Sequence, residues 1–117
     1  MKKVGIICFA NYCRSPVAEK LFQKFIKNIS FTSFGVKPLA TSNMDKRSSS
    51  FLKNKGIEDT EHYPKKITAI DIEKLNIILC IDHLILARMN KSFPSYRHKF
   101  KLFSYKNPLV SISDHLV

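Results

Sequence analysis

The chain has 117 residues, 44% of them hydrophobic, which suits a single domain over residues 1–117 with one core. Lys and Arg number 20 against 9 Asp and Glu, and the formal net charge of +11 favours nucleic acid, anionic surfaces or phosphorylated substrates without choosing among them. No apolar stretch is as long as a membrane helix requires, and the first one is interrupted at Asn11 and Arg14 with no small-residue cleavage site behind it, so we expect neither a membrane segment nor a secretion signal.

The first predicted elements are a strand, a short loop and a helix. Residues 4–8 form an apolar run of strand length. Pro16 suits the first turn of the helix that follows, since the N–H that proline lacks would have no partner in that turn. The helix itself is predicted from apolar residues that repeat with helical periodicity, namely Val17, Leu21, Phe22, Phe25 and Ile26.

The middle of the chain predicts a second strand and two short helices. Residues 29–34 alternate between apolar and polar side chains like a strand, and residues 35–44 contain the Gly, Pro, Ser and Asn of a loop. A helix is expected over residues 45–55, capped by Asp45 and ended by Gly56. Residues 68–71 match a capping box, which predicts the start of another short helix.

The last predicted elements repeat the opening order of strand and helix. Residues 76–81 form a continuous apolar strand, Asp82 is a candidate cap, and residues 84–90 are helical in character. After a turn at residues 92–95, residues 100–104 predict a fourth strand. Strands that alternate with helices predict an α/β fold of three layers, with a central four-stranded parallel sheet flanked by helices.

The cysteine content indicates a reducing compartment. Cys8, Cys13 and Cys80 are an odd number and too few for a disulfide scaffold, and no second cysteine or histidine pair stands at metal-ligand spacing. We therefore expect a cytoplasmic protein with no metal site and no cofactor. Cys80 lies in an apolar run and is expected in the core.

The loop after the first strand predicts a phosphate site. Cys8 and Arg14 are separated by five residues between a strand and a helix, so the loop's N–H groups and the helix N-terminus point at an anion while Arg14 offers a planar fork to two of its oxygens. The same field favours the thiolate of Cys8, to which Ser15 adds a hydroxyl donor. Phosphate, sulfate or a similar oxyanion is the expected occupant. With Cys8 as nucleophile, the predicted phosphate-binding residues are Phe9, Ala10, Asn11, Tyr12, Cys13, Arg14 and Ser15.

Residues 8–16, followed by Val17-Ala18-Glu19, closely resemble the signature of low-molecular-weight protein tyrosine phosphatases. Further likenesses follow in the family's order along nearly the whole chain. They are Ser33 with Gly35, Asp45 with Arg47, Gly56-Ile57, residues 62–68 and residues 76–82.

The resemblance implies a two-step displacement at phosphorus. Cys8 would form a cysteinyl-phosphate while Arg14 and the loop amides hold the equatorial oxygens. The family's general acid matches Asp114, although the proline that follows it in the family is His115 here. Asp114 would protonate the leaving phenol and then activate water. The implied substrate is a phosphorylated protein, above all phosphotyrosine, or a small phosphomonoester.

The resemblance also implies supporting roles. Asn11 resembles the residue that braces the loop through Ser33 and His62. Cys13 either forms a protective disulfide with Cys8, as a neighbouring cysteine does in the family, or is a small buried hydrophobe. The other histidines, His83, His98 and His115, are expected at the surface.

Three departures from the family leave alternatives open. Ala10 replaces a glycine, which strains the loop only if that position needs positive φ. Tyr12 either stacks on an aromatic substrate or packs at the rim. The family's C-terminal helix is expected to be absent after Val117, which points to a shortened chain, to cover from another subunit in a homodimer, or to an impaired remnant.

Other functions are weaker fits. Thioredoxin-coupled arsenate reductases share this loop but need further cysteines, where this chain has Cys80 alone. Protein-arginine phosphatases are built on the same frame, but they resemble sequences that have a threonine where this chain has Tyr12. Ala10 and His115 suggest a weakly active or inactive phosphate-binding domain. The retention of Cys8 argues against this alternative. Nucleic-acid binding rests on charge alone.

Overall fold

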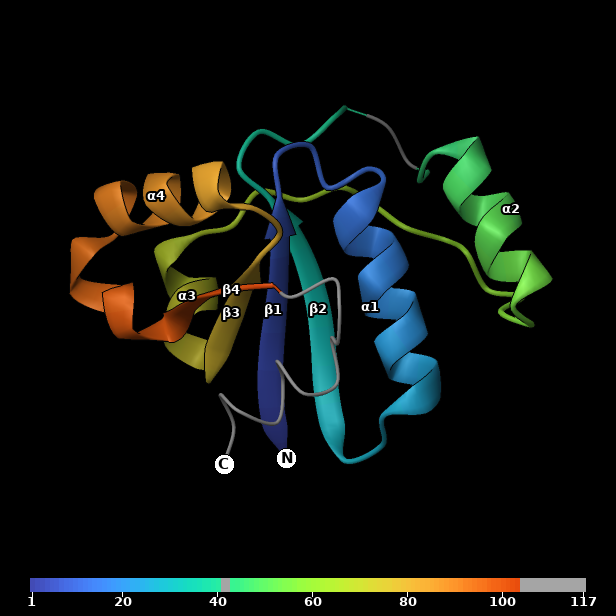
Figure 1. The fold of residues 1–117 in the computed structure, drawn as a ribbon, viewed down its shortest axis with the longest axis horizontal. Coiled ribbons are helices and arrows are strands. Elements are labelled where there is room, and N and C mark those ends of the chain that lie inside the picture. The colour runs from blue at the N-terminus through green and yellow to red at the C-terminus, as the bar shows by residue number, and fades with distance from the viewer. Residues whose placement is uncertain (41–42, 104–117) are drawn as a thin grey trace.

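The structure, a computed structural model, describes residues 1–40 and 43–103. The predicted α/β fold is confirmed: four parallel strands form one sheet in the order β2-β1-β3-β4 (Figure 1). The expectations about Asp114, His115 and a missing C-terminal helix lie outside the described residues. In chain order the elements are β1 (Lys2–Cys8), α1 (Arg14–Phe25), β2 (Ile29–Gly35), α2 (Lys46–Asn54), α3 (Ala69–Lys74), β3 (Ile77–Cys80), α4 (His83–Ser92), the 3₁₀ helix η1 (Pro94–Lys99) and β4 (Phe100–Leu102).

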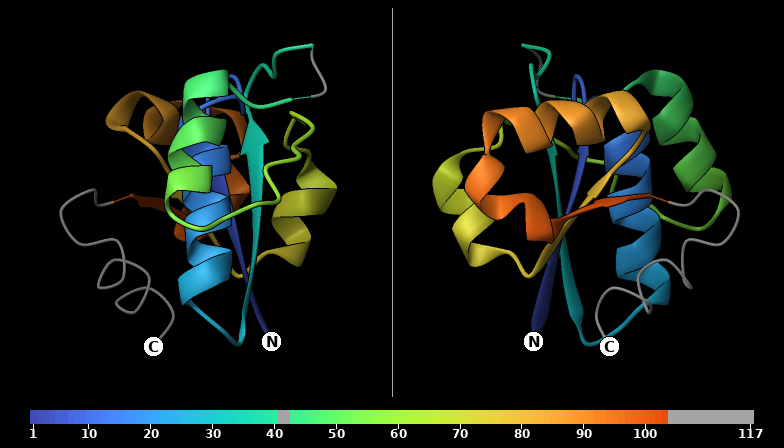
Figure 2. Two further views of the ribbon diagram at one scale, coloured as in Figure 1. Left: turned by 90° about the vertical axis from the view of Figure 1, so that its right-hand side faces the viewer. Right: turned by 60° about the vertical axis from the view of Figure 1, so that its left-hand side comes forward.

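Helices cover both faces of the sheet, which gives the three predicted layers (Figure 2). On one face, Val4, Ile6 and Leu79 pack against Ala18 and Phe22 of α1. On the other face, the alternate strand residues meet α3 and α4, chiefly through Ile72, Ile85 and Met89. Because β1 and β3 are buried on both faces, they read as continuous apolar runs in the sequence.

Local capping fixes where the helices begin. Asp45 accepts hydrogen bonds from the N–H groups of Arg47 and Ser48 at the start of α2. The capping box predicted at Thr68 and Asp71 is confirmed at the start of α3. These bonds satisfy backbone donors that lack partners in the first turn of a helix.

The structure corrects several predicted boundaries. The third strand is Ile77–Cys80, one residue shorter at each end than predicted, although the N–H groups of Asn76 and Ile81 still donate to the carbonyls of Lys3 and Ile7 in β1. At Asn76 the side-chain Oδ1 takes the place of a backbone carbonyl and accepts from the N–H of Lys3. The fourth strand is described as Phe100–Leu102, and residue 104 lies outside the described residues. The expected turn at residues 92–95 continues into the 3₁₀ helix Pro94–Lys99, which the sequence did not indicate.

The strand order indicates that a ligand site lies at the carboxyl ends of the strands. The chain passes from β1 to β2 on one side and then to β3 on the other, so the connections after β1 and β3 diverge at their carboxyl ends. In parallel sheets such a divergence opens the crevice where ligands bind. Among the helices within residues 1–40 and 43–103, none is long and apolar enough to cross a bilayer.

Candidate phosphate-binding and catalytic site

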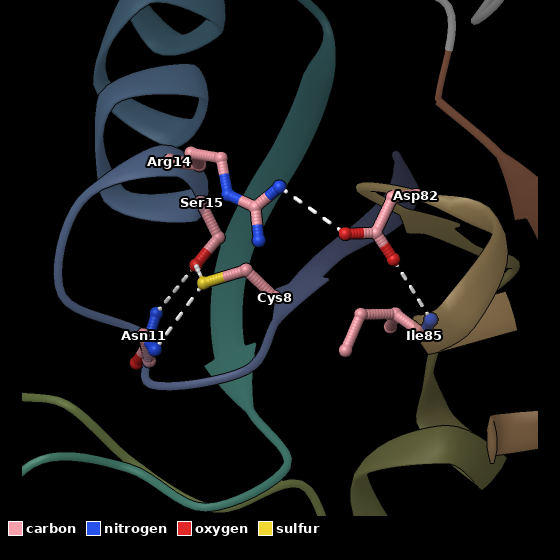
Figure 3. A network of polar contacts seen from close by, with 6 residues as sticks. All are labelled: Cys8, Asn11, Arg14, Ser15, Asp82 and Ile85. Carbon is pink, nitrogen blue, oxygen red and sulfur yellow. Dashed lines mark hydrogen bonds and ion pairs between the residues drawn. The ribbon is translucent and has the colours of Figure 1, made fainter.

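The predicted loop lies at this crevice. Cys8 is the last residue of β1, and Arg14 is the first of α1, so the five residues between them form the loop. The Cys8 side chain is buried at the bottom of the loop (Figure 3). The structure therefore brings together the nucleophile, the arginine and the helix N-terminus that the sequence predicted.

One group of α1 and one of the loop contact the sulfur of Cys8. Ser15 Oγ lies 2.9 Å from Cys8 Sγ, and the backbone N–H of Asn11 donates to the same sulfur over 3.2 Å (Figure 3). The hydroxyl of Ser15 and the N–H of Asn11 thus both lie against the sulfur. The expected contact between Ser15 and the sulfur of Cys8 is present.

The carbonyl groups of the loop are turned outward. Those of Cys8, Phe9, Ala10 and Tyr12 accept hydrogen bonds from the N–H groups of residues 36, 37, 39 and 45, and the carbonyl of Asn11 accepts from His62. In a trans peptide the following N–H points away from its neighbouring carbonyl, and the described residues contain no cis peptide. The N–H groups of residues 9–13 are therefore directed to the opposite side, as the bond from Asn11 to Cys8 Sγ demonstrates. Such a series of N–H groups forms an anion-binding concavity.

Asn11 braces the loop from inside. Its Nδ2 donates to Ser15 Oγ and to Ser33 Oγ, each over 3.0 Å, and its Oδ1 accepts from the N–H of Lys65 over 2.9 Å. Asn11 is fully buried and has a φ of 53°, a conformation that asparagine tolerates better than most residues. The predicted contact with Ser33 is confirmed. The bond to Lys65 was not predicted.

His62 holds the same segment from outside. Its Nε2 lies 2.9 Å from the carbonyl oxygen of Asn11, and since a carbonyl can only accept, Nε2 carries the proton. Burial lowers the pKa of His62 below its usual range, against a smaller opposing effect of this hydrogen bond. The predicted contact between His62 and Asn11 is confirmed, with the ring in its neutral form at neutral pH.

Ala10 and Gly35 show where the loop is confined. Within the described residues, positive φ outside glycine occurs at Asn11 and Asn28, so the strain considered for Ala10 does not arise. Gly35 ends β2 against the loop, and a Cβ there would lie 2.9 Å from the carbonyl oxygen of Phe9 and 3.0 Å from Asn11 Cβ. The glycine therefore permits a close approach of two backbones.

Glu19 is a contributor that sequence reasoning missed. Its carboxylate is buried in α1 and accepts a hydrogen bond from the N–H of Ser33 over 2.5 Å. This bond fixes the strand residue that contacts Asn11. A charged residue on the apolar face of the predicted helix was the signal that could have revealed it.

Asp82 connects the loop to α4. Its Oδ2 accepts from Arg14 Nη1 over 3.2 Å, and its Oδ1 accepts from the N–H of Ile85 over 2.9 Å (Figure 3). The backbone bond from Ile85 and then Arg14 lower the pKa of Asp82. The sequence identified Asp82 as a cap, which is confirmed, but not as a partner of Arg14.

The remaining cysteines differ in exposure. Cys13 is exposed, so its alternative as a buried hydrophobe is wrong. Although the residue as a whole is exposed, desolvation of its thiol by neighbouring atoms and the nearby Asp45 carboxylate raise the pKa of Cys13. Cys80 is in the core as predicted, and burial raises its pKa to about 12.

The other predicted site residues have less defined roles. The side chains of Phe9 and Tyr12 are exposed and half-buried respectively, and whether Tyr12 stacks on a substrate stays a prediction. His83 and His98 are at the surface, as expected. In the part of the chain that the structure describes, no three His, Cys, Asp or Glu side chains are grouped to hold a metal.

Comparisons with known proteins agree with this geometry. The family model of low molecular weight phosphotyrosine protein phosphatase matches residues 3–111. The chain is 29% identical over 98 residues to the low molecular weight protein-tyrosine-phosphatase Etp of Escherichia coli, covering 84% of this chain and 66% of Etp. It is 36% identical over 98 residues to the human low molecular weight phosphotyrosine protein phosphatase, covering 77% of this chain and 61% of the human one.

A solved structure shows the same fold. Vibrio vulnificus Wzb, in complex with benzylphosphonate, superimposes with a TM-score of 0.82 at 25% identity, covering 89% of this chain and 74% of Wzb. The matched part of this chain spans 66% of the length of Etp and 61% of the length of the human relative, which is less than two thirds of each. With the family model matched over most of its length, the chain belongs to the low molecular weight phosphotyrosine protein phosphatase family.

Proposed function

We propose that the chain is a phosphatase that hydrolyses phosphotyrosine or similar phosphomonoesters through a covalent intermediate on Cys8. The observation that carries the proposal is the arrangement of the loop: a buried sulfur with the Ser15 hydroxyl at 2.9 Å and the Asn11 N–H at 3.2 Å, below N–H groups whose neighbouring carbonyls are all engaged elsewhere. Family membership and the net charge of +11 support a phosphorylated substrate.

In the first step, Cys8 Sγ attacks phosphorus in line with the leaving oxygen. A P–S bond forms, the P–O bond to the phenol breaks, and Asp114 gives its proton to the departing oxygen. Arg14 and the loop N–H groups hold the three equatorial oxygens, where charge is spread in the transition state. In the second step Asp114 takes a proton from water, whose oxygen attacks phosphorus, and the P–S bond breaks to release phosphate and the thiolate.

The role of Asp114 rests on resemblance, since the residue lies outside the described part of the chain. The aryl substrate rests on relatives named tyrosine phosphatases and on Tyr12 at the rim. Benzylphosphonate, with which Wzb forms a complex, should bind the loop of residues 8–15 here and compete with substrate.

The test is hydrolysis of para-nitrophenyl phosphate from acidic to neutral pH. Cys8→Ser should abolish turnover, because the hydroxyl is a far weaker nucleophile, and Asp114→Asn should slow it by roughly 10²- to 10⁴-fold. Cys80→Ser is the matched control, since this cysteine lies in the core away from the loop. Phosphate binding by the intact protein without turnover would favour the alternative, an inactive phosphate-binding domain.

A further inference from the structure

A recess lies on the α4 side of residues 8–15, which we call the phosphate loop. It has a volume of about 490 Å³ and is lined by Phe9, Arg14, Asp82, Leu84, Ile85 and Arg88. Phe9 directly follows the nucleophile, and Arg14 belongs to the phosphate loop itself. We refer to this recess as the α4 groove. Whatever binds in it lies beside a phosphate held over Cys8.

The α4 groove exposes apolar side chains. Leu84 is 81% exposed and Phe9 is 44% exposed. Covering large hydrophobic side chains such as these with a bound group is favourable, because it removes apolar surface from water. Ile85 forms the buried floor next to them. The groove therefore offers a surface on which the methylene groups of a bound side chain gain by burial.

A cation lies at the rim of the same groove. The guanidinium of Arg88 is 5.5 Å from the ring centroid of Phe9, within the range of a cation–π contact. Arg88 is four residues after Leu84, so the two side chains share one face of α4. The aromatic contact holds the guanidinium in place while its donor edge can still bind a carboxylate.

The positive charge at this rim is not neutralised within the described residues. The carboxylate of Asp82 lines the groove but pairs with Arg14. Over residues 1–40 and 43–103, no Asp or Glu lies within ion-pair distance of Arg88. The groove thus combines an apolar floor with an available cation, which is complementary to an acidic side chain with an aliphatic stem.

We infer that the α4 groove binds the side chain next to the phosphorylated residue of a protein substrate and prefers glutamate there. The methylene groups of the glutamate pack on Phe9 and Leu84, and its carboxylate binds Arg88. Since consecutive Cα atoms are about 3.8 Å apart, only a residue close to the phosphorylated one reaches the groove. The inference rests on the proposed function and gives that site a preference for acidic protein substrates.

Binding of stable peptide analogues tests the inference without requiring turnover. The peptides carry a difluoromethylphosphonate in place of the tyrosine phosphate, with Glu or Gln either before or after it. For the wild type, we expect the Glu peptide of one of these two pairs to bind roughly two- to fivefold more tightly than its Gln counterpart, as for an exposed ion pair. Arg88→Gln should remove that preference, and Arg88→Glu should reverse it, so that the Gln peptide binds more tightly than the Glu peptide.

Arg97→Gln is the matched control, because it removes the same charge from an exposed residue of η1 that does not line the groove. It should retain the wild-type preference. Equal binding of Glu and Gln peptides by the wild type, no peptide binding at all, or a preference that survives in Arg88→Gln would each overturn the inference. Hydrolysis of para-nitrophenyl phosphate by the wild type is measured in parallel, so a failure of the proposed function is seen separately.

Discussion

Arg14 and Asp82, which are 68 residues apart in the sequence, meet across the crevice between the ends of β1 and β3, with Nη1 3.2 Å from Oδ2. The contact joins the phosphate loop to the first turn of α4 (Figure 3). Both side chains are partly exposed, at 50% and 37%, so solvent screens the pair and its net contribution to stability is small. We expect its larger effect to be on the orientation of the Arg14 guanidinium.

Asp82→Asn separates orientation from capping. Asparagine caps a helix about as well as aspartate, so the free energy of unfolding should change by less than about 0.5 kcal/mol. The charge that holds Arg14 is lost, so kcat/KM for para-nitrophenyl phosphate should fall by roughly two- to tenfold. Asp82→Ala should lose the same activity and a further ~1 kcal/mol of stability. Unchanged kcat/KM in Asp82→Asn would show that the pair does not position Arg14.

Asn11→Ala should destabilise the loop from its interior. The substitution removes the acceptor of the Lys65 N–H and the amide that donates to the hydroxyls of Ser15 and Ser33, and it puts alanine at a φ of 53°. We expect a loss of about 2–4 kcal/mol in denaturant unfolding. Asn11→Gly, which tolerates positive φ but lacks the same hydrogen bonds, should lose less. Equal losses for the two variants would mean that backbone strain is negligible here.

Gly35→Ala should impair activity more than stability. Its Cβ would meet the backbone of the phosphate loop at 2.9 Å, and a displaced loop should lower kcat/KM by roughly 10- to 100-fold. Gly5→Ala is the matched control, because its Cβ would meet the flexible end of Leu75 at 2.7 Å. That variant should lose about 1–3 kcal/mol of stability and keep its kcat/KM. The opposite pattern would refute the role assigned to Gly35.

His62 should make stability depend on pH. The pKa of His62 is 6.5 in the unfolded state and is lowered in the folded protein. At a pH between the folded-state and the unfolded-state pKa, the unfolded state therefore binds more protons. The stability that this group contributes is complete above pH 6.5 and is lost as the pH falls toward the lower, folded-state pKa. His62→Gln, which keeps a donor for the carbonyl of Asn11, should show a weaker decline over that window in chemical unfolding at a series of pH values. An identical decline in both proteins would exclude His62 as its source.

Much of the fold and the centre of the site could be predicted from the sequence because their signals are local. A cap acts on N–H groups two or three residues away, so Asp45, Thr68 and Asp82 identified the starts of three helices. The phosphate loop is likewise one short segment between a strand and a helix. Its spacing of Cys8 and Arg14 predicts an anion site without any knowledge of distant residues.

The parts that were missed depend on contacts between distant segments. Lys65 supplies its N–H to Asn11 across 54 residues, Asp82 meets Arg14 across 68, and the α4 groove needs Phe9 and Arg88 on adjacent elements. Local patterns determined the elements, the buried runs and the loop chemistry of this protein. Only the tertiary structure decided which side chains meet at the carboxyl edge of the sheet, because the strand order β2-β1-β3-β4 brings those segments together and no local periodicity encodes that order.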